Sequence, residues 1–115
     1  MAGSERQVIA YKNYFLDFYE KLPDNAQRKI EWTLNLIRVT PHVPEKYFKH
    51  LEGTKGLYEI RVDVGSNTYR IFSFFDKGNL VVLGNAFQKE TQKTPKQELE
   101  RAIRIMEEYH DENKK

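Results

Sequence analysis

In the central part of the chain, residues 57–64 alternate between apolar and polar side chains with a period of two. This period is typical of strands that bury one face. Residues 57–64 and 67–75 predict two strands, and the Gly65-Ser66 pair between them predicts a tight hairpin turn, because glycine accepts a positive φ angle. A second turn at residues 76–79 precedes a third strand over residues 80–87. The stretch therefore predicts three consecutive antiparallel strands.

The loop of the first hairpin decides which side chains face one another. A loop at residues 65–66 places Arg61 opposite Arg70, although like charges in that position destabilise a sheet by about 0.2–1 kcal/mol. A loop at residues 66–67 shifts the register by two and places Arg70 opposite Asp63, as an ordinary salt bridge. The turn chemistry favours the first register, in which two neighbouring guanidinium groups would suit a bound anion.

Two helices are predicted before these strands, because apolar side chains recur there with helical spacing. The first ends at Pro23, and the second begins at Asp24, a candidate N-cap, and runs to about Val39. The short link predicts an antiparallel helical hairpin. Residues 7–10 predict a short first strand, and Trp32, which lies off the second stripe, is expected to cover the sheet edge or meet a partner. The stripes are Tyr11, Tyr14, Phe15, Phe18 and Leu22, then Ala26, Ile30, Leu34 and Ile37.

A basic connector and a C-terminal helix complete the chain. Thr94 predicts the N-cap of the last helix and Pro95 its first residue, and the inward stripe consists of Leu99, Ile103 and Met106. The connector, residues 41–56, contains Lys49, His50 and Lys55. It is interpreted either as a solvated basic loop or as the entrance of an RNA-binding groove, where these three residues would contact RNA. Its histidines lack further ligands at a spacing that suits a metal.

Composition and charge narrow the class of protein. The 115 residues are expected to form one domain, with a disordered start over residues 1–6. A net charge of +2 leaves room only for a local basic patch, and the lack of cysteine excludes disulfides and thiolate zinc sites. No stretch has the apolar length of a membrane span or the apolar core of a secretory signal. We therefore expect a cytoplasmic protein without a membrane partner.

Four cations carry the candidate chemistry. The sequence lacks a glycine-rich phosphate loop, a nucleophile motif and a metal-ligand cluster, so no cofactor is expected. Arg61 and Arg70 on one sheet face, closed by Lys89 and Lys93, share an affinity for phosphate. Such groups suit metal-independent RNA cleavage, because the substrate's own 2′-hydroxyl attacks and the protein stabilises the added negative charge. A lysine can help to move protons if crowding by the arginines lowers its pKa.

Both arginines are expected to be exposed, so that replacing either one by alanine would change the free energy of unfolding by less than about 0.5 kcal/mol. Tyr58 and Phe87 flank the four cations and are candidates for stacking on an RNA base. Tyr58 lies on the apolar strand face, however, and is interpreted as a core residue.

Three motifs in order give the chain a family resemblance. GLYEIR, YRIF and FQKETQKTP resemble the RelE superfamily of bacterial type II toxins, in its HigB-like branch related to a phage-derived protein family. The resemblance extends from about Phe48 to the last helix. It implies a metal-independent endoribonuclease that cuts messenger RNA in the ribosomal A site, with a helix-turn-helix antitoxin as partner. It also implies that Arg61 and Arg70 bind phosphate. Where the family usually carries two lysines, this chain has Lys89-Glu90.

The resemblance further implies that Lys89 and Lys93 transfer protons and neutralise charge. The resulting expectation is an α+β fold with an N-terminal helical hairpin and a C-terminal helix packed on a small, mostly antiparallel sheet. Two other functions stay open on the same fold. One is a non-catalytic RNA- or ribosome-binding module, in which the arginines only bind phosphate, and the other is a protein-interaction domain for an acidic partner segment.

Overall fold

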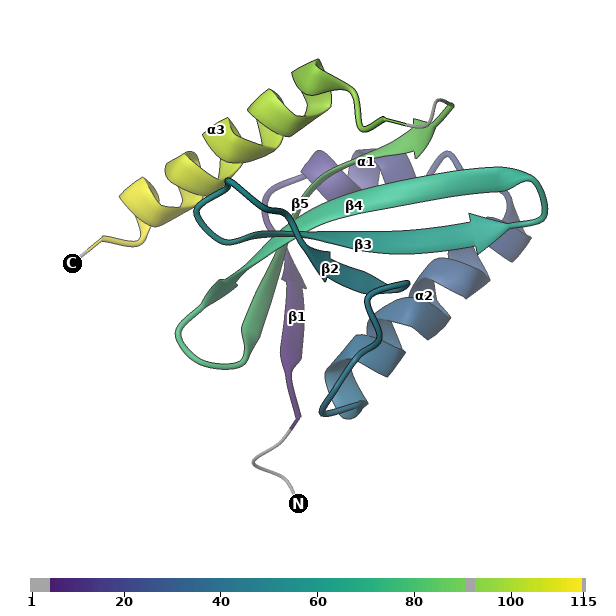
Figure 1. Cartoon of the computed structure of the whole chain (residues 1–115), viewed down its shortest axis with the longest axis horizontal. Helices are drawn as coiled ribbons and strands as arrows, with labels where there is room; N and C mark the ends of the chain where they lie inside the picture. The colour runs from purple at the N-terminus through teal and green to yellow at the C-terminus, as the bar shows by residue number, and fades with distance from the viewer. Residues whose placement is uncertain (1–4, 91–92, 115) are drawn as a thin grey trace.

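The computed structural model describes residues 5–90 and 93–114. Within them, five strands form one sheet in the order β1-β5-β4-β3-β2, and three helices pack on it (Figure 1). Neighbouring strands are antiparallel, except that β1 runs parallel to β5. The predicted α+β class with a mostly antiparallel sheet is confirmed. The elements are β1 Gln7–Ala10, α1 Tyr14–Tyr19, α2 Asp24–Val39, β2 Phe48–His50, β3 Leu57–Val64, β4 Asn67–Asp76, β5 Leu80–Lys89 and α3 Lys96–Glu112.

Helices cover both faces of the sheet, with α3 on one side and α1 and α2 on the other (Figure 1). Successive strand residues point to opposite faces, so each strand contributes to two cores. The core under α1 and α2 includes Ile30, Ile37, Ile60 and Ile71. The core under α3 includes Phe72, Phe74, Ile105 and Met106. Both α1 and α2 lie on the same face, while their antiparallel hairpin geometry stays a prediction.

The first hairpin has the register that the turn chemistry favours. Val64 pairs with Asn67, and Arg61 pairs directly with Arg70. Gly65 takes a φ of +59°, which supplies the positive angle that the two-residue turn needs. The alternative register, with Arg70 directly opposite Asp63, is therefore wrong.

The first predicted helix is wrong in extent. The helix α1 begins only at Tyr14, because Lys12 has a φ of +53°, which lies outside the helical region. Tyr11 instead continues β1, and its backbone N–H donates to the carbonyl of Leu83 at 3.1 Å. Its ring lies 5.1 Å from that of Tyr109, on the face covered by α3. The aromatic stripe is thus divided between the two cores: Tyr11 and Tyr14 pack against the core under α3, whereas Phe15 and Phe18 pack against the core under α1 and α2.

Two helix starts and one strand also differ from the expectation. Pro23 and Pro95 occupy the N-cap positions, so Asp24 is the first residue of α2 and Thr94 lies one residue before the cap of α3. Neither cap makes a side-chain hydrogen bond. The connector contains the strand β2, which pairs with β3 and ends the sheet. Its three residues are too few for a period of two to be recognised.

Trp32 lies on the outer side of α2 and is 50% exposed. Its ring contacts that of Tyr47, with 5.7 Å between the centroids, immediately before β2. Trp32 therefore lies beside the edge strand of the sheet, which agrees with the first of its two predicted roles.

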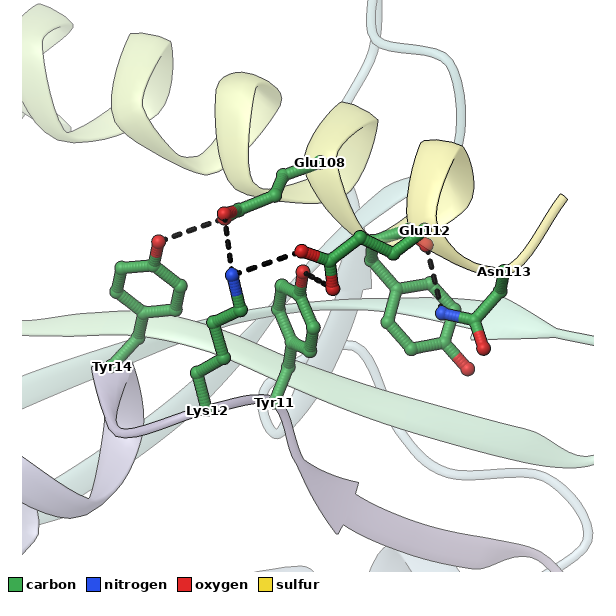
Figure 2. Close-up of polar contacts among 7 residues, drawn as sticks. Tyr11, Lys12, Tyr14, Glu108, Glu112 and Asn113 are labelled. Atoms are coloured by element: carbon green, nitrogen blue, oxygen red, sulfur yellow. Dashed lines mark hydrogen bonds and ion pairs between the residues drawn. The ribbon is translucent and has the colours of Figure 1, made fainter.

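The far half of α3 is held by a group of tyrosines, carboxylates and one lysine (Figure 2). Lys12 Nζ lies 2.7 Å from Glu108 Oε2 and 3.0 Å from Glu112 Oε2. Tyr14 donates a hydrogen bond to Glu108 at 2.8 Å, and Tyr11 donates one to Glu112 at 2.6 Å. Donation from Lys12 to Glu108 and from Tyr11 to Glu112 lowers the pKa of each carboxyl, and burial raises the pKa of Tyr11 to about 12.

Residues 1–4 of the predicted disordered start lie outside the described residues. Arg6, by contrast, donates hydrogen bonds to the carbonyl oxygens of Ile37, Thr40 and Pro41 at 2.9, 2.7 and 2.9 Å, and so joins the end of α2 to the start of β1. Among the described residues, no helix combines the length and the apolar character that a membrane crossing needs, and no group of three potential metal-ligating side chains comes together.

Candidate functional site

Strand pairing gathers the predicted cations on the sheet face that α3 covers. Cross-strand partners and alternate residues share a face, so the register places side chains without further assumption. Lys49 pairs with Glu59, Arg61 with Arg70, and Thr68 with Lys89. The residues brought to this face are Lys49 from β2, Glu59 and Arg61 from β3, Arg70 from β4, and Lys89 from β5. We call these five residues the basic cluster.

Glu59 lies at the centre of the basic cluster, and the sequence reasoning missed it. Its side chain is only 4% exposed. Glu59 Oε1 lies 3.4 Å from Arg61 Nε and 3.7 Å from Arg70 Nε. Glu59 Oε2 accepts a hydrogen bond of 3.0 Å from the Thr94 hydroxyl, which comes from the segment before α3. One carboxylate therefore offsets the repulsion between two guanidinium groups that the register forces together.

The two arginines differ in environment. The side chain of Arg70 is 9% exposed, whereas that of Arg61 is 30% exposed. Arg70 also donates from Nη1 to the carbonyl of Tyr69 at 2.9 Å and lies 3.6 Å from Asp63 Oδ1. The expectation that both arginines are exposed is thus wrong for Arg70, which is buried beside Glu59 and its partner Thr94.

Free donors remain on the better exposed arginine. The Nε groups of Arg61 and Arg70 are buried and near Glu59, but neither meets the geometry of a hydrogen bond. Within residues 5–90 and 93–114, the terminal nitrogens of Arg61 donate no hydrogen bond. Two donor-rich nitrogens of a fixed cation therefore stay available to an external anion, which guanidinium binds well when it carries paired oxygens.

Lys89 lies partly buried at the rim of the basic cluster. Burial lowers its pKa most, and the charges of Arg70 and Arg61 lower it further, while Glu59 and Asp63 act in the opposite direction. The lowered pKa agrees with the expectation from crowding by arginines, although burial is the larger cause. A lysine in this position is closer to a reversible proton acceptor than an ordinary surface lysine.

The other predicted site residues are dispersed. Lys93 is exposed and directly precedes Thr94, and Lys49 lies on the face of the basic cluster. His50 lies on the opposite face, where its ring contacts Tyr58, with 5.2 Å between the centroids. Tyr58 itself packs against the core under α1 and α2, which confirms its interpretation as a core residue.

Phe87 pairs with Arg70 in the sheet but is buried, and Lys55 lies in the loop between β2 and β3. Phe87 is 8% exposed, and its ring stacks on that of Phe72 with 5.7 Å between the centroids. Its ring is therefore part of the core under α3. Lys55 lines a hollow of about 390 Å³ together with Met106 and His110 of α3. The structure does not bring Lys55 to the arginines.

Comparison with known proteins identifies the family of the chain and a solved structure with a similar fold. The family described as phage-derived protein Gp49-like (DUF891) matches residues 17–107. Among solved structures, the chain is similar to one from the archaeal RelE–RelB complex of Pyrococcus horikoshii OT3, with 21% sequence identity and a TM-score of 0.55. The match covers 78% of this chain and 99% of the other, and it shows a shared fold. No protein of curated function matches the sequence.

Proposed function

We propose that this chain, which belongs to the Gp49-like family of phage-derived proteins, is the toxin of a type II toxin–antitoxin pair. The fold shared with a chain of a RelE–RelB complex supports this proposal. We assign the chain to the HigB-like branch on the three motifs of its sequence. Its partner would then be an antitoxin with a helix-turn-helix domain.

The proposed activity is ribosome-dependent cleavage of messenger RNA in the A site. The observation that carries it is the pairing of Arg61 with Arg70 on a face that also presents Lys89 with a lowered pKa. In the reaction, the 2′-hydroxyl oxygen bonds to the adjacent phosphorus while the bond from phosphorus to the 5′-oxygen breaks. The protein supplies fixed positive charge where negative charge develops, and one such group is typically worth about 10²–10³-fold in rate.

Each cation has a proposed role in this scheme. Arg61 and Arg70 bind the phosphate and neutralise its added charge, because guanidinium keeps its charge at any working pH. Lys89 accepts the proton of the 2′-hydroxyl in its neutral form, and Lys93 neutralises charge and supplies a proton to the departing 5′-oxygen. Lys49 would lead the RNA backbone into the basic cluster. The RNA contacts of His50, Lys55 and Phe87 stay predictions, with less support from their positions.

The test is cleavage of a defined message on purified bacterial ribosomes. The upstream fragment should end in a 2′,3′-cyclic phosphate or its opened monophosphate, and the downstream fragment should begin with a 5′-hydroxyl. Cleavage should persist when a chelator removes free divalent cations, provided that enough Mg²⁺ remains to keep the ribosomes assembled. A single deoxyribose in place of the attacking ribose should abolish it. A 5′-phosphate on the downstream fragment, or cleavage of the deoxy-substituted message, would refute the mechanism.

A cellular test addresses the toxin assignment separately from the mechanism. Expression of the folded protein alone in a bacterial host should arrest growth and deplete messages bound to polysomes. Co-expression of the adjacent helix-turn-helix protein should restore both. Unchanged growth and intact polysomal messages, at a level where soluble protein is detected, would contradict the toxin assignment.

A further inference from the structure

A buried carboxylate in the middle of a phosphate-binding cluster needs a physical reason. Glu59 is 3% exposed, and a buried charge is costly unless it is paired. It also repels the anion that the surrounding cations would attract. The position of Glu59 therefore has to contribute something that outweighs both costs.

The contacts of Glu59 indicate what it contributes. Its Oε1 atom lies near the Nε atoms of both arginines, at 3.4 and 3.7 Å, and so contacts one edge of each guanidinium group. The terminal nitrogens of Arg61 donate no hydrogen bond within the described residues. The Oε2 atom accepts the Thr94 hydroxyl at 3.0 Å and thereby joins the arginines to the segment that carries Lys93.

We propose that Glu59 is a positioning residue, which holds Arg61 and Arg70 by their Nε edges so that the terminal nitrogens of Arg61 face an RNA phosphate. This inference rests on the proposed function and deepens it. Glu59 touches neither substrate nor reacting atoms; it fixes the direction of the groups that do. Without it, two like charges in direct register would move apart, and the distance between the phosphate and its cations would increase.

The decisive variant is Glu59→Gln, which keeps the shape of the side chain and an acceptor for Thr94 but removes the charge. The matched control is Asp63→Asn, which removes a carboxylate near Arg70 from the same face but from a side chain that is 70% exposed. Both variants should be assayed at a temperature where unfolding curves show them to be fully folded. Single-message cleavage on ribosomes then gives kcat and KM.

Glu59→Gln should lower kcat by about 10²-fold, because a displaced charged group no longer matches the transition state, with a much smaller change in KM. Asp63→Asn should change kcat by no more than about fivefold, as expected for an exposed ion pair. A folded Glu59→Gln protein with the kcat of the wild type would overturn the inference, because Glu59 would then contribute to stability alone. Equal losses in the two variants would also overturn it.

A spectroscopic measurement separates this inference from the proposed function. The Nε–H signals of Arg61 and Arg70 in nitrogen-15 NMR should be distinct and slow to exchange with water in the wild type. They should broaden or merge with those of exposed arginines in Glu59→Gln, whereas the Arg61 signal should not change in Asp63→Asn, because Asp63 pairs with Arg70 and not with Arg61. If wild-type protein does not cleave RNA, the proposed function fails, and these signals alone decide the inference. Signals of Glu59→Gln identical to those of the wild type would refute it.

Discussion

Replacement of the two paired arginines by alanine should affect stability unequally. Both residues lie in the same register, and the sequence alone gives no reason to distinguish them. In the structure, Arg70 is 9% exposed and donates to the Tyr69 carbonyl at 2.9 Å, while Arg61 is 30% exposed and its Nε atom lies 3.4 Å from Glu59 Oε1. Arg70→Ala should therefore destabilise the fold clearly more than Arg61→Ala.

The magnitude follows from what each change leaves behind. Removing one partner of a buried ion pair costs about 3–5 kcal/mol when the other charge is left alone. After Arg70→Ala, however, Glu59 keeps Arg61 Nε at 3.4 Å and the Thr94 hydroxyl at 3.0 Å. We therefore expect a loss of about 2 kcal/mol, close to that of a hydrogen bond to a charged group, which corresponds to about 8 °C in Tm for a chain of this size. Arg61→Ala should cost less than about 1 kcal/mol.

Thermal unfolding followed by circular dichroism, together with urea unfolding, measures both values. Arg104→Ala, at an exposed position of α3, is the matched control and should lie within about 0.5 kcal/mol of the wild type. The background of Glu59→Gln adds a second check, because Arg70→Ala should cost less there if the two residues interact. Equal losses for Arg61→Ala and Arg70→Ala, or a stabilised Arg70→Ala protein, would refute the account of the buried pair.

Four further predictions follow from the charges. Lys89→Ala should slow RNA cleavage by about 10²–10⁴-fold and weaken RNA binding far less, and a parallel loss in both would assign Lys89 to binding. Because Arg70 lowers the pKa of Lys89, Arg70→Ala should move the rise of the residual pH–rate profile to higher pH. A plot of log K for RNA binding against the logarithm of the salt concentration should fall with a slope of about 0.7 for each phosphate that is contacted. A flat plot would contradict phosphate binding. The pKa values of Glu108 and Glu112 in the folded protein are lowered from 4.5. The two carboxylates therefore stabilise the fold above pH 4.5, and this contribution is lost as the pH falls through their pKa values in the folded protein. The Tm of the double variant Glu108→Gln/Glu112→Gln should consequently fall less steeply in acid than that of the wild type.

The register of the first hairpin could be predicted because its determinants are local. Gly65 at the first turn position and the alternation on either side of it leave few ways to pair the strands. The placement of Arg61 opposite Arg70 follows directly from that turn. The placement of Ile30 and Ile37 in one core could also be predicted from the local sequence. Helical spacing puts both side chains on one face of α2, whatever that face packs against.

The burial of Glu59 and Arg70 could not be predicted, because it depends on which sheet face α3 covers. Alternation separates two faces of a strand but does not say which of them is open to water. The charged face of β3 looks like a solvated face until Thr94, distant in the sequence, donates to Glu59. An acidic residue two positions before Arg61, on the same strand face as two arginines in register, could however have signalled a shared counter-charge.

The break at Lys12 illustrates a second limit. A run of aromatic side chains at helical intervals predicts one helix, yet a positive φ at a single residue divides the run between a strand end and α1. Lysine has no special preference for that conformation, so its sequence gives little warning. The contacts of Lys12 with Glu108 and Glu112 offer a physical reason, because they join this turn to α3 (Figure 2).

These long-range contacts connect the proposed site to the docking of α3. Just before the start of α3, the Thr94 hydroxyl donates a hydrogen bond to Glu59. Toward the end of the helix, Glu108 and Glu112 form ion pairs with Lys12. Between them, Ile105 and Met106 pack against the sheet. A helix is stiff along its length, so its displacement at one end would alter the contacts at the other. The position of Arg61 relative to Arg70 thus depends on local strand pairing, whereas the contact of Thr94 with the carboxylate that both arginines share depends on how α3 docks.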